Sequence, residues 1–181
     1  MKSEDNIIMD LVEMCKKNDR ISQKIIYDKF YGKMMGVALR YFKNRDLASD
    51  IVQESFIKVF SKIEQFKGGK NLEGWIKRIV RNNCIDELRK NKKIYFTSED
   101  VLKNISEEEN DNLSNYEHLT ISDISGAVQE LSTSYRIVFN LYVFEGLTHK
   151  EIANTLNIKE GTSKSNYAKA KSKIKLILSN K

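Results

Sequence analysis

Apolar side chains recur every three or four residues along the N-terminal half of the chain, which is the spacing of one face of an α-helix. The pattern predicts amphipathic helices near Ile7 to Cys15, from about Ser22 to Phe42, from Asp46 to Ile63 and from Trp75 to Lys93. Asp46 suits the start of the third helix, because its carboxylate can accept hydrogen bonds from unpaired backbone amides. The N-terminal block is therefore predicted to be a small helical module.

A second helical block follows near the C-terminus. The stretch SYRIVFNLYVFEG predicts a helix that Gly146 ends as a C-terminal cap. Thr148 and Glu151 fit the capping box S/T-x-x-E, so the next helix should start at His149. The residues NIKE make a turn into a last helix, whose inward positions are Ser163, Tyr167, Ala170, Ile174 and Ile177. The spacing predicts a helix-turn-helix.

Composition favours an all-α fold made of two small helical modules. The 181 residues include no proline and only eight glycines, so few positions break a helix, and we expect little or no sheet. No apolar run approaches the roughly 18 to 20 residues of a membrane span. Acidic residues near the N-terminus do not fit a signal peptide, so a cytoplasmic location is expected.

Charge divides the chain into three segments. Residues 1–93 hold 21 Lys and Arg against 13 Asp and Glu, residues 94–127 hold 1 against 8, and residues 128–181 hold 9 against 4. The acidic middle is poor in aromatic residues, so it cannot bury enough apolar surface to offset the entropy of ordering it. We expect a flexible acidic linker at 94–127 between domains at 1–93 and 128–181. The basic domains favour an anionic partner, such as nucleic acid or a membrane surface.

Few residues offer covalent or metal chemistry. Cys15 and Cys84 lie far apart among apolar residues and are expected to be buried free thiols. His118 and His149 have no ligand set nearby and are expected on the surface. We therefore predict no catalytic residue, no metal and no cofactor.

Asp50 and Glu54 lie one helical turn apart, and two carboxylates on one helix face can do acid and base chemistry. No histidine, cysteine or glycine-rich phosphate loop lies near them in the sequence. A solvated or protein-binding face is therefore the better interpretation.

Two segments have residue types that bind DNA. The fourth helix gathers basic and amide side chains on its polar face, and the preceding loop FKGGKN joins an aromatic ring, two lysines and an amide to two flexible glycines. Such a loop can receive an unstacked base, although an ordinary cationic helix surface is the alternative.

In the last helix, Lys164 could reach guanine acceptors and Ser165 could donate or accept a hydrogen bond, if this helix enters the major groove. Lys169, Lys171 and Lys173 would add attraction to phosphate. An antiparallel helical pair with a solvated lysine face would give a similar pattern, so that alternative stays open.

Three stretches follow one another over almost the whole chain: DLASDIVQESFIKVFSKI, LEGWIKRIVRNNCIDELRK and LSTSYRIVFNLYVFEGLTHKEIANTLNIKEGTSKSNYAKAK. Together they closely resemble the bacterial sigma-70 family, specifically its small extracytoplasmic-function (ECF) group. The resemblance implies a non-enzymatic subunit that brings core RNA polymerase to promoter DNA. A four-helix region 2 would read and melt the minus 10 element, and a helix-turn-helix region 4 would read the minus 35 element. It also implies an anti-sigma factor as partner, often membrane-anchored.

The resemblance assigns roles to individual residues. The positions that match core polymerase docking are Asp50, Gln53, Glu54 and Phe56. Those that match recognition of the minus 10 element are Phe66, Lys67, Lys70, Asn71, Trp75, Arg78, Arg81 and Asn82. Those that match recognition of the minus 35 element are Thr148, Lys150, Lys164, Ser165, Ala168, Lys169 and Lys171. Of the last set, Thr148 and Lys150 would contact the DNA backbone.

Two other functions compete with this interpretation. A helix-turn-helix transcription regulator whose N-terminal domain binds a signal explains residues 128–181 equally well, and it predicts no stable complex with core polymerase. A helical adaptor without a nucleic-acid role would work unchanged at high salt, whereas DNA affinity that rests on several Lys and Arg contacts falls steeply with salt.

Overall fold

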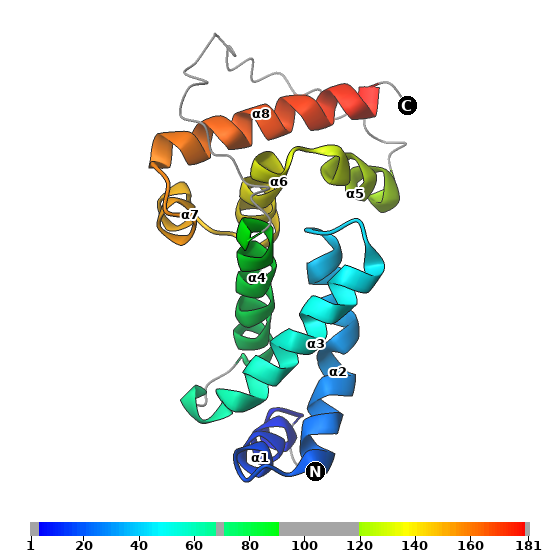
Figure 1. Ribbon diagram of the computed structural model, residues 1–181, viewed down its shortest axis with the longest axis vertical. Coiled ribbons are helices and arrows are strands. Elements are labelled where there is room, and N and C mark those ends of the chain that lie inside the picture. The colour runs from blue at the N-terminus through cyan, green and yellow to red at the C-terminus, as the bar shows by residue number, and fades with distance from the viewer. Residues whose placement is uncertain (1–3, 68–70, 91–119, 180–181) are drawn as a thin grey trace. The chain divides into compact units, whose positions relative to one another are not determined.

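The computed structural model describes residues 4–67, 71–90 and 120–179. Within those residues the chain forms helices and turns and no strand, so the all-α prediction is confirmed (Figure 1). The chain divides into two compact units, Met1–Glu87 and Leu88–Lys181, which we call the first and second units. Most of the expected acidic linker lies outside the described residues.

The first unit contains α1 (Glu4–Lys16), α2 (Arg20–Leu39), α3 (Arg45–Ser61), the short 3-10 helix η1 (Ile63–Gln65) and most of α4 (Leu72–Lys90). Helix α2 packs against α1 and α3, and η1 packs against the same two helices. Each of the four helices that hydrophobic periodicity predicted in this block is present. Their buried stripes form the core, which includes Ile26, Phe30, Met34, Val52, Phe56, Ile76 and Val80.

The cap of α3 differs from the prediction. The side-chain oxygen of Asn44 accepts hydrogen bonds from the backbone amides of Asp46 and Leu47, at 2.8 and 3.0 Å. Asn44 is thus the N-cap, and Asp46 lies inside the first turn, where its negative charge faces the positive end of the helix dipole.

Both cysteines are buried free thiols, as the sequence predicted. Burial raises the pKa of the Cys15 thiol to about 11 and that of the Cys84 thiol to about 12. Neither thiol is therefore ionised to any useful extent near neutral pH, and both serve as small apolar core residues.

The second unit contains α5 (Ile121–Glu130), α6 (Thr133–Phe139), the π-helical segment η3 (Asn140–Phe144), α7 (His149–Leu156) and α8 (Glu160–Ser179). Helix α8 packs against α5, α6 and α7, so it is the central element of the unit. The helix predicted from SYRIVFNLYVFEG is α6 continued by η3. It ends before Gly146, which takes the left-handed backbone conformation expected of a C-terminal glycine, with φ 67°.

The second unit begins earlier than charge and composition indicated. Residues 120–127 were assigned to the linker, but Thr120 caps α5 in a capping box with Asp123, and Ala127 lies in the core of the unit. The segment is acidic and serine-rich and still forms a helix, because the capping box pairs the first amides and α8 covers its apolar side.

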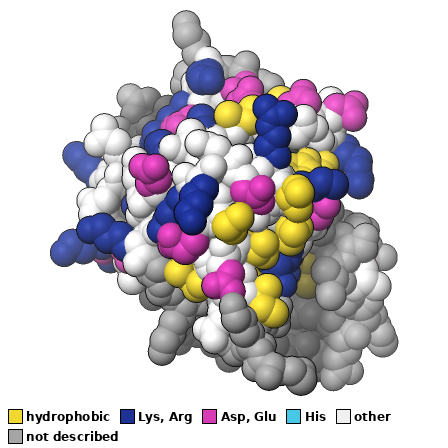
Figure 2. All heavy atoms as spheres, turned by 90° about the horizontal axis from the view of Figure 1, so that it is seen from below, with side chains coloured by type: hydrophobic (Ala, Val, Ile, Leu, Met, Phe, Trp, Pro, Cys, Tyr) yellow, Lys and Arg dark blue, Asp and Glu magenta, His cyan; other side chains and the backbone are white. Residues whose placement is uncertain are grey.

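One end of the first unit exposes apolar side chains next to charged ones. Figure 2 views the molecule from the side of α1 and shows these groups intermixed. The exposed apolar residues on α1 and the start of α2 are Ile7, Met14, Ile21 and Ile25. Among the described helices, none combines the length and the apolar content that crossing a bilayer requires.

Candidate nucleic-acid interface

Helix α7 begins where the capping box predicted. The Glu151 amide donates to the Thr148 hydroxyl at 3.3 Å, and the Glu151 carboxylate accepts from the Thr148 amide and hydroxyl at 2.8 and 2.7 Å. These hydrogen bonds hold the pKa of Glu151 below its usual value. Thr148 is exposed at the start of the helix, but its hydroxyl proton is already donated to Glu151.

The turn between α7 and α8 is tight and built from the backbone. Asn157 adopts the left-handed conformation with φ 55° and ψ 51°, which asparagine tolerates better than most residues. The Ile158 amide donates to the Ala153 carbonyl at 3.0 Å and closes the turn. The two helices and this turn form the helix-turn-helix that the sequence spacing predicted.

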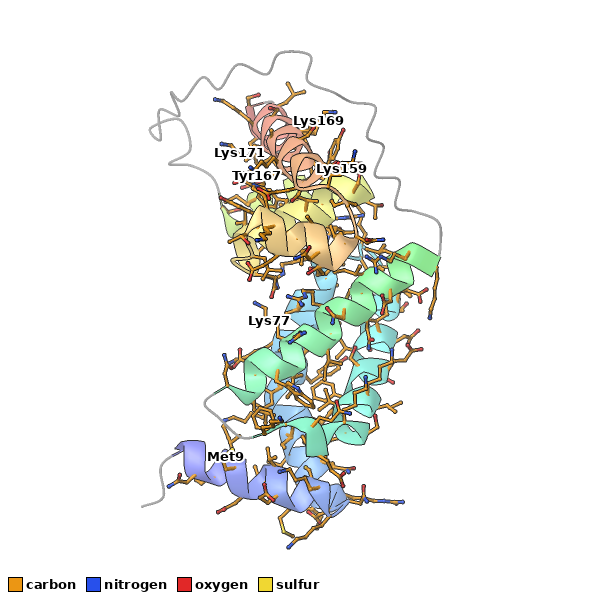
Figure 3. All side chains as sticks on the ribbon, turned by 90° about the vertical axis from the view of Figure 1, so that its left-hand side faces the viewer. Met9, Lys77, Lys159, Tyr167, Lys169 and Lys171 are labelled. Atoms are coloured by element: carbon orange, nitrogen blue, oxygen red, sulfur yellow. The ribbon has the colours of Figure 1, made fainter. Side chains whose placement is uncertain are left out.

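Helix α8 separates a buried side from a cationic side. Ser163, Asn166 and Ala170 are buried, whereas Lys164 and Lys171 are exposed. Lys164, Ala168 and Lys171 follow one another at four and three residues, so they share one face. Lys169 lies about 140° round the helix from Lys164 and belongs to the flank. Figure 3 marks Lys159 just before α8, and Lys169 and Lys171 farther along it.

An aromatic cluster fixes α7 and η3 against α8. The His149 ring stacks on Tyr142 with centroids 4.6 Å apart, and Tyr142 lies 4.4 Å from Tyr167. His149 Nδ1 is also 3.0 Å from the Ser163 hydroxyl oxygen. Burial, and secondly the charge of Lys164, lowers the pKa of His149. His149 was expected to be a surface side chain and is instead a packing residue, while His118 lies outside the described residues.

In the first unit, α4 gathers part of the predicted minus 10 set on one face. Trp75, Arg78 and Asn82 recur at three and four residues and lie within about 60° of one another. Arg78 and Asn82 are exposed and Trp75 is half-buried. Arg81 lies on a different side of α4 and is only 9 % exposed, and its guanidinium donates to the Asn82 side-chain oxygen at 3.2 and 3.3 Å. Arg81 was expected on the surface and is largely buried.

The loop before α4 presents fewer free groups than its sequence indicated. Phe66 is buried and its ring lies 5.5 Å from the Trp75 ring, so in this state it is a core side chain and not an open stacking surface. The Asn71 side chain caps α4 by accepting from the Gly74 amide at 2.7 Å. A Cβ on residue 74 would lie 2.7 Å from the Asn71 amide nitrogen, so a larger residue there would displace the Asn71 side chain from its capping position. Lys67 is exposed, and Lys70 lies outside the described residues.

Helix α3 carries the candidate protein-docking face. Asp50, Gln53 and Glu54 are exposed on one side of the helix, as predicted. Phe56 is not part of that surface, because it is 2 % exposed and packs edge-on against Tyr27 with centroids 4.8 Å apart. The apolar residue that the face exposes is Ile57, at 69 %.

Helical spacing explains why Ile57 is exposed on the candidate docking face of α3 and Phe56 is not. Ile57 lies seven residues after Asp50 and three after Glu54, which places it on the acidic side of the helix. Phe56 belongs instead to the buried stripe that runs through Ile51, Val52 and Val59. The spacing alone could have separated these adjacent apolar residues.

A polar network joins α3 to α4 beneath these surfaces. The Ser55 hydroxyl is fully buried and donates to the Ile51 carbonyl at 2.6 Å. It accepts from the Asn83 side-chain amide at 2.7 Å, and the Asn83 oxygen accepts from the Lys58 ammonium at 2.7 Å. Because buried polar groups are costly unless paired, this network favours one register of α4 on α3. No sequence pattern predicted this network.

Family models match two parts of the chain. The model of Sigma-70 region 2 matches residues 26–94, and that of Sigma-70, region 4 matches residues 121–174. Among relatives, the RNA polymerase sigma factor SigV of Bacillus subtilis (strain 168) is 32 % identical over 134 residues, which span 74 % of this chain and 77 % of SigV. The ECF RNA polymerase sigma factor SigM of the same organism is 28 % identical over 153 residues, 84 % of this chain and 92 % of SigM.

Solved structures share the fold. The sigma factor RpoE, in complex with the anti-sigma factor NepR from Bartonella quintana, has a TM-score of 0.55 at 22 % identity and covers 86 % of this chain and 96 % of its own. CnrH, in complex with the cytosolic domain of CnrY, has a TM-score of 0.53 at 15 % identity and covers 94 % of this chain and 96 % of its own.

Proposed function

The chain belongs to the sigma-70 family of RNA polymerase sigma factors, in its extracytoplasmic-function group, and we propose that its helical units divide promoter recognition between them. As a sigma factor it directs core polymerase to specific promoters and initiates transcription there by recognising the minus 35 and minus 10 elements and helping to melt the duplex. The observation that carries this function is the presence of both family regions, in order, in one chain. The alternative function, a helix-turn-helix regulator that does not bind core polymerase, does not explain the match to region 2 at residues 26–94.

Recognition of the minus 35 element falls to α8. Its N-terminal half presents Lys164, Ser165 and Ala168 toward the groove, and Lys171 extends the same cationic face toward phosphate. Lys169 on the flank, with Lys150 and Thr148 at the start of α7, supplies further backbone contacts. The aromatic cluster around His149 supports this role, because it holds α7 and α8 at a fixed angle.

Recognition and opening of the minus 10 element fall to α4 and the loop before it. Trp75, Arg78 and Asn82 offer a stacking ring, a cation and an amide on one face, and Lys67 adds a cation beside them. Unstacking a base costs a few kcal/mol, so a surface that holds the extruded base can open the duplex by binding alone. The factor is therefore not an enzyme. Phe66 and Arg81 act by shaping this surface, and Asn71 by fixing the start of α4.

Docking on core polymerase falls to α3. Asp50, Gln53 and Glu54 provide an acidic and polar rim, and Ile57 replaces Phe56 as the apolar contact at its edge. An exposed apolar side chain within a polar rim is the arrangement found in protein interfaces.

The helices and the family matches support the domain limits that we propose. We place region 2 in residues 1–93, and we start region 4 at Thr120 instead of residue 128, because α5 belongs to the second unit. The acidic linker then spans about 26 residues, with a fully extended reach on the order of 90 Å.

An anti-sigma factor is the expected regulatory partner. Among the similar solved structures, the sigma factor RpoE is in complex with the anti-sigma factor NepR, and CnrH is in complex with the cytosolic domain of CnrY. The exposed apolar residues of α1 and α2 give a protein partner a surface to cover. The factor must reach core polymerase and promoter DNA, so we expect it to act in the cytoplasm. Co-purification that recovers only polymerase subunits under non-inducing conditions would count against this partner.

Run-off transcription tests the function. The purified chain is added to core RNA polymerase with a pool of fragments from its own genome. We expect discrete new transcripts that share upstream sequences. A chain that binds duplex fragments yet neither joins core polymerase nor starts transcription would be a helix-turn-helix regulator instead.

A further inference from the structure

Glu160 is the first residue of α8. In a helix-turn-helix, the N-terminal residues of this second helix contact base edges in the major groove. Glu160 lies one turn before Lys164 and within about 40° of it round the helix, so both side chains leave α8 on the same side. Both are exposed, with 47 % and 61 % of their side chains accessible.

The two side chains form an ion pair. The Lys164 ammonium lies 2.8 Å from a carboxylate oxygen of Glu160. This hydrogen bond and the positive charge of Lys164 lower the pKa of Glu160. Glu160 is thus an ionised acid on a surface that is otherwise cationic.

A carboxylate at this position is repelled by DNA phosphates, but it can accept a hydrogen bond from one kind of base edge. In the major groove, cytosine presents the N4 amino group as a donor, and a glutamate accepts from it. Adenine also has a donor, N6, but beside the N7 acceptor, which repels a carboxylate. Guanine and thymine present acceptors. The acid therefore favours cytosine over the other three bases.

The spacing of Glu160 and Lys164 along α8 also limits how far apart the two bases that they contact can lie. Four residues of helix advance about 6 Å, and base pairs are stacked about 3.4 Å apart. Lys164 and Glu160 thus reach the same base pair or pairs one to two steps apart. The ammonium seeks guanine O6 and N7 while the carboxylate seeks cytosine N4, so together they read a guanine and a cytosine.

We propose that Glu160 is a specificity-determining residue, whose carboxylate selects cytosine at one position of the minus 35 element beside the guanine that Lys164 selects. The inference rests on the proposed function, because it requires α8 to face that element. Glu160 opposes binding to DNA in general and favours one sequence, which is how a negative charge improves discrimination on a cationic surface.

Three variants test this role in the full chain, assembled with core polymerase. Glu160→Ala removes the acceptor, and Glu160→Gln replaces the carboxylate with an amide that can pair with adenine N6 and N7. Glu130→Gln at the end of α5 removes the same charge from an exposed acid outside the helix-turn-helix and serves as the matched control. Each holoenzyme is presented with promoters in which every minus 35 position is changed in turn to each base.

We expect wild type and Glu130→Gln to prefer cytosine at one position by at least about fivefold. Glu160→Ala should lose that preference, and Glu160→Gln should shift it toward adenine. Unchanged base preferences in both Glu160 variants, or no cytosine preference in wild type, would overturn the assignment of Glu160. A wild-type holoenzyme that selects no minus 35 sequence at all would overturn the proposed function together with it.

Discussion

The adjacent residues Phe56 and Ile57 are expected to respond in opposite ways to truncation. Ile57 is 69 % exposed and Phe56 only 2 %. Full burial of an isoleucine side chain stabilises by about 1.5 to 3 kcal/mol, so covering the exposed part of Ile57 in a complex contributes about 1 to 2 kcal/mol. Ile57→Ala should therefore raise the Kd for core polymerase by about 5- to 30-fold and leave the free energy of unfolding nearly unchanged.

Phe56→Ala should instead act on the fold. Removing a buried phenylalanine costs about 3 to 5 kcal/mol, a large share of the roughly 5 to 15 kcal/mol that holds an ordinary domain folded. The assays are urea unfolding of each variant and titration of each folded chain against core polymerase. Ile21→Ala, at another strongly exposed isoleucine on α2, is the control for loss of apolar surface. Wild-type affinity for core polymerase in Ile57→Ala, or wild-type stability with lost affinity in Phe56→Ala, would refute these roles of the two residues.

Three further predictions concern the fold that supports these surfaces. Ser55→Ala and Asn83→Leu should be coupled by about 0.5 to 3 kcal/mol in a double-mutant cycle of urea unfolding. Additive losses of stability would mean that the network does not fix the register of α4 on α3. Cys84, whose pKa burial raises to about 12, should react with a thiol reagent at pH 8 only as the protein unfolds, so labelling at the rate of a free thiol would contradict its placement. Hydrogen bonds from Thr148 lower the pKa of Glu151 in the folded state, so its stabilising effect is present above the unfolded pKa and is lost as the pH falls through the folded one. The thermal midpoint of wild type should drop more steeply below pH 4.5 than that of Glu151→Gln, and parallel pH curves would exclude this contribution.

Helical spacing of apolar residues predicted α1 to α4 and α6 to α8. It did not predict α5, because the acidic, serine-rich segment was assigned to the linker. The capping box at Thr148 likewise located the start of α7, since both partners lie within one turn. The sequence did not predict the π-helical segment Asn140–Phe144. One extra residue in a single turn changes the spacing of apolar residues too little to be recognised over so short a stretch.

Surface assignments were less reliable, because exposure depends on what packs from elsewhere in the chain. Tyr27 of α2 covers Phe56, and Tyr142 of η3 stacks on His149. Arg81 is basic and lies among exposed basic residues, yet it faces inward and bonds to Asn82. A sequence motif gives the residue types of a binding helix but not which of them point at the ligand.

We expect this one chain to join polymerase to a promoter and to open the DNA by binding. The most direct test is permanganate reactivity of thymines in a promoter fragment incubated with core polymerase and this protein, without nucleotides. We expect reactive, unpaired thymines around the minus 10 element only when both proteins are present. Thymines that stay protected, although the complex forms on the promoter, would contradict the claim that this factor melts DNA through its binding energy.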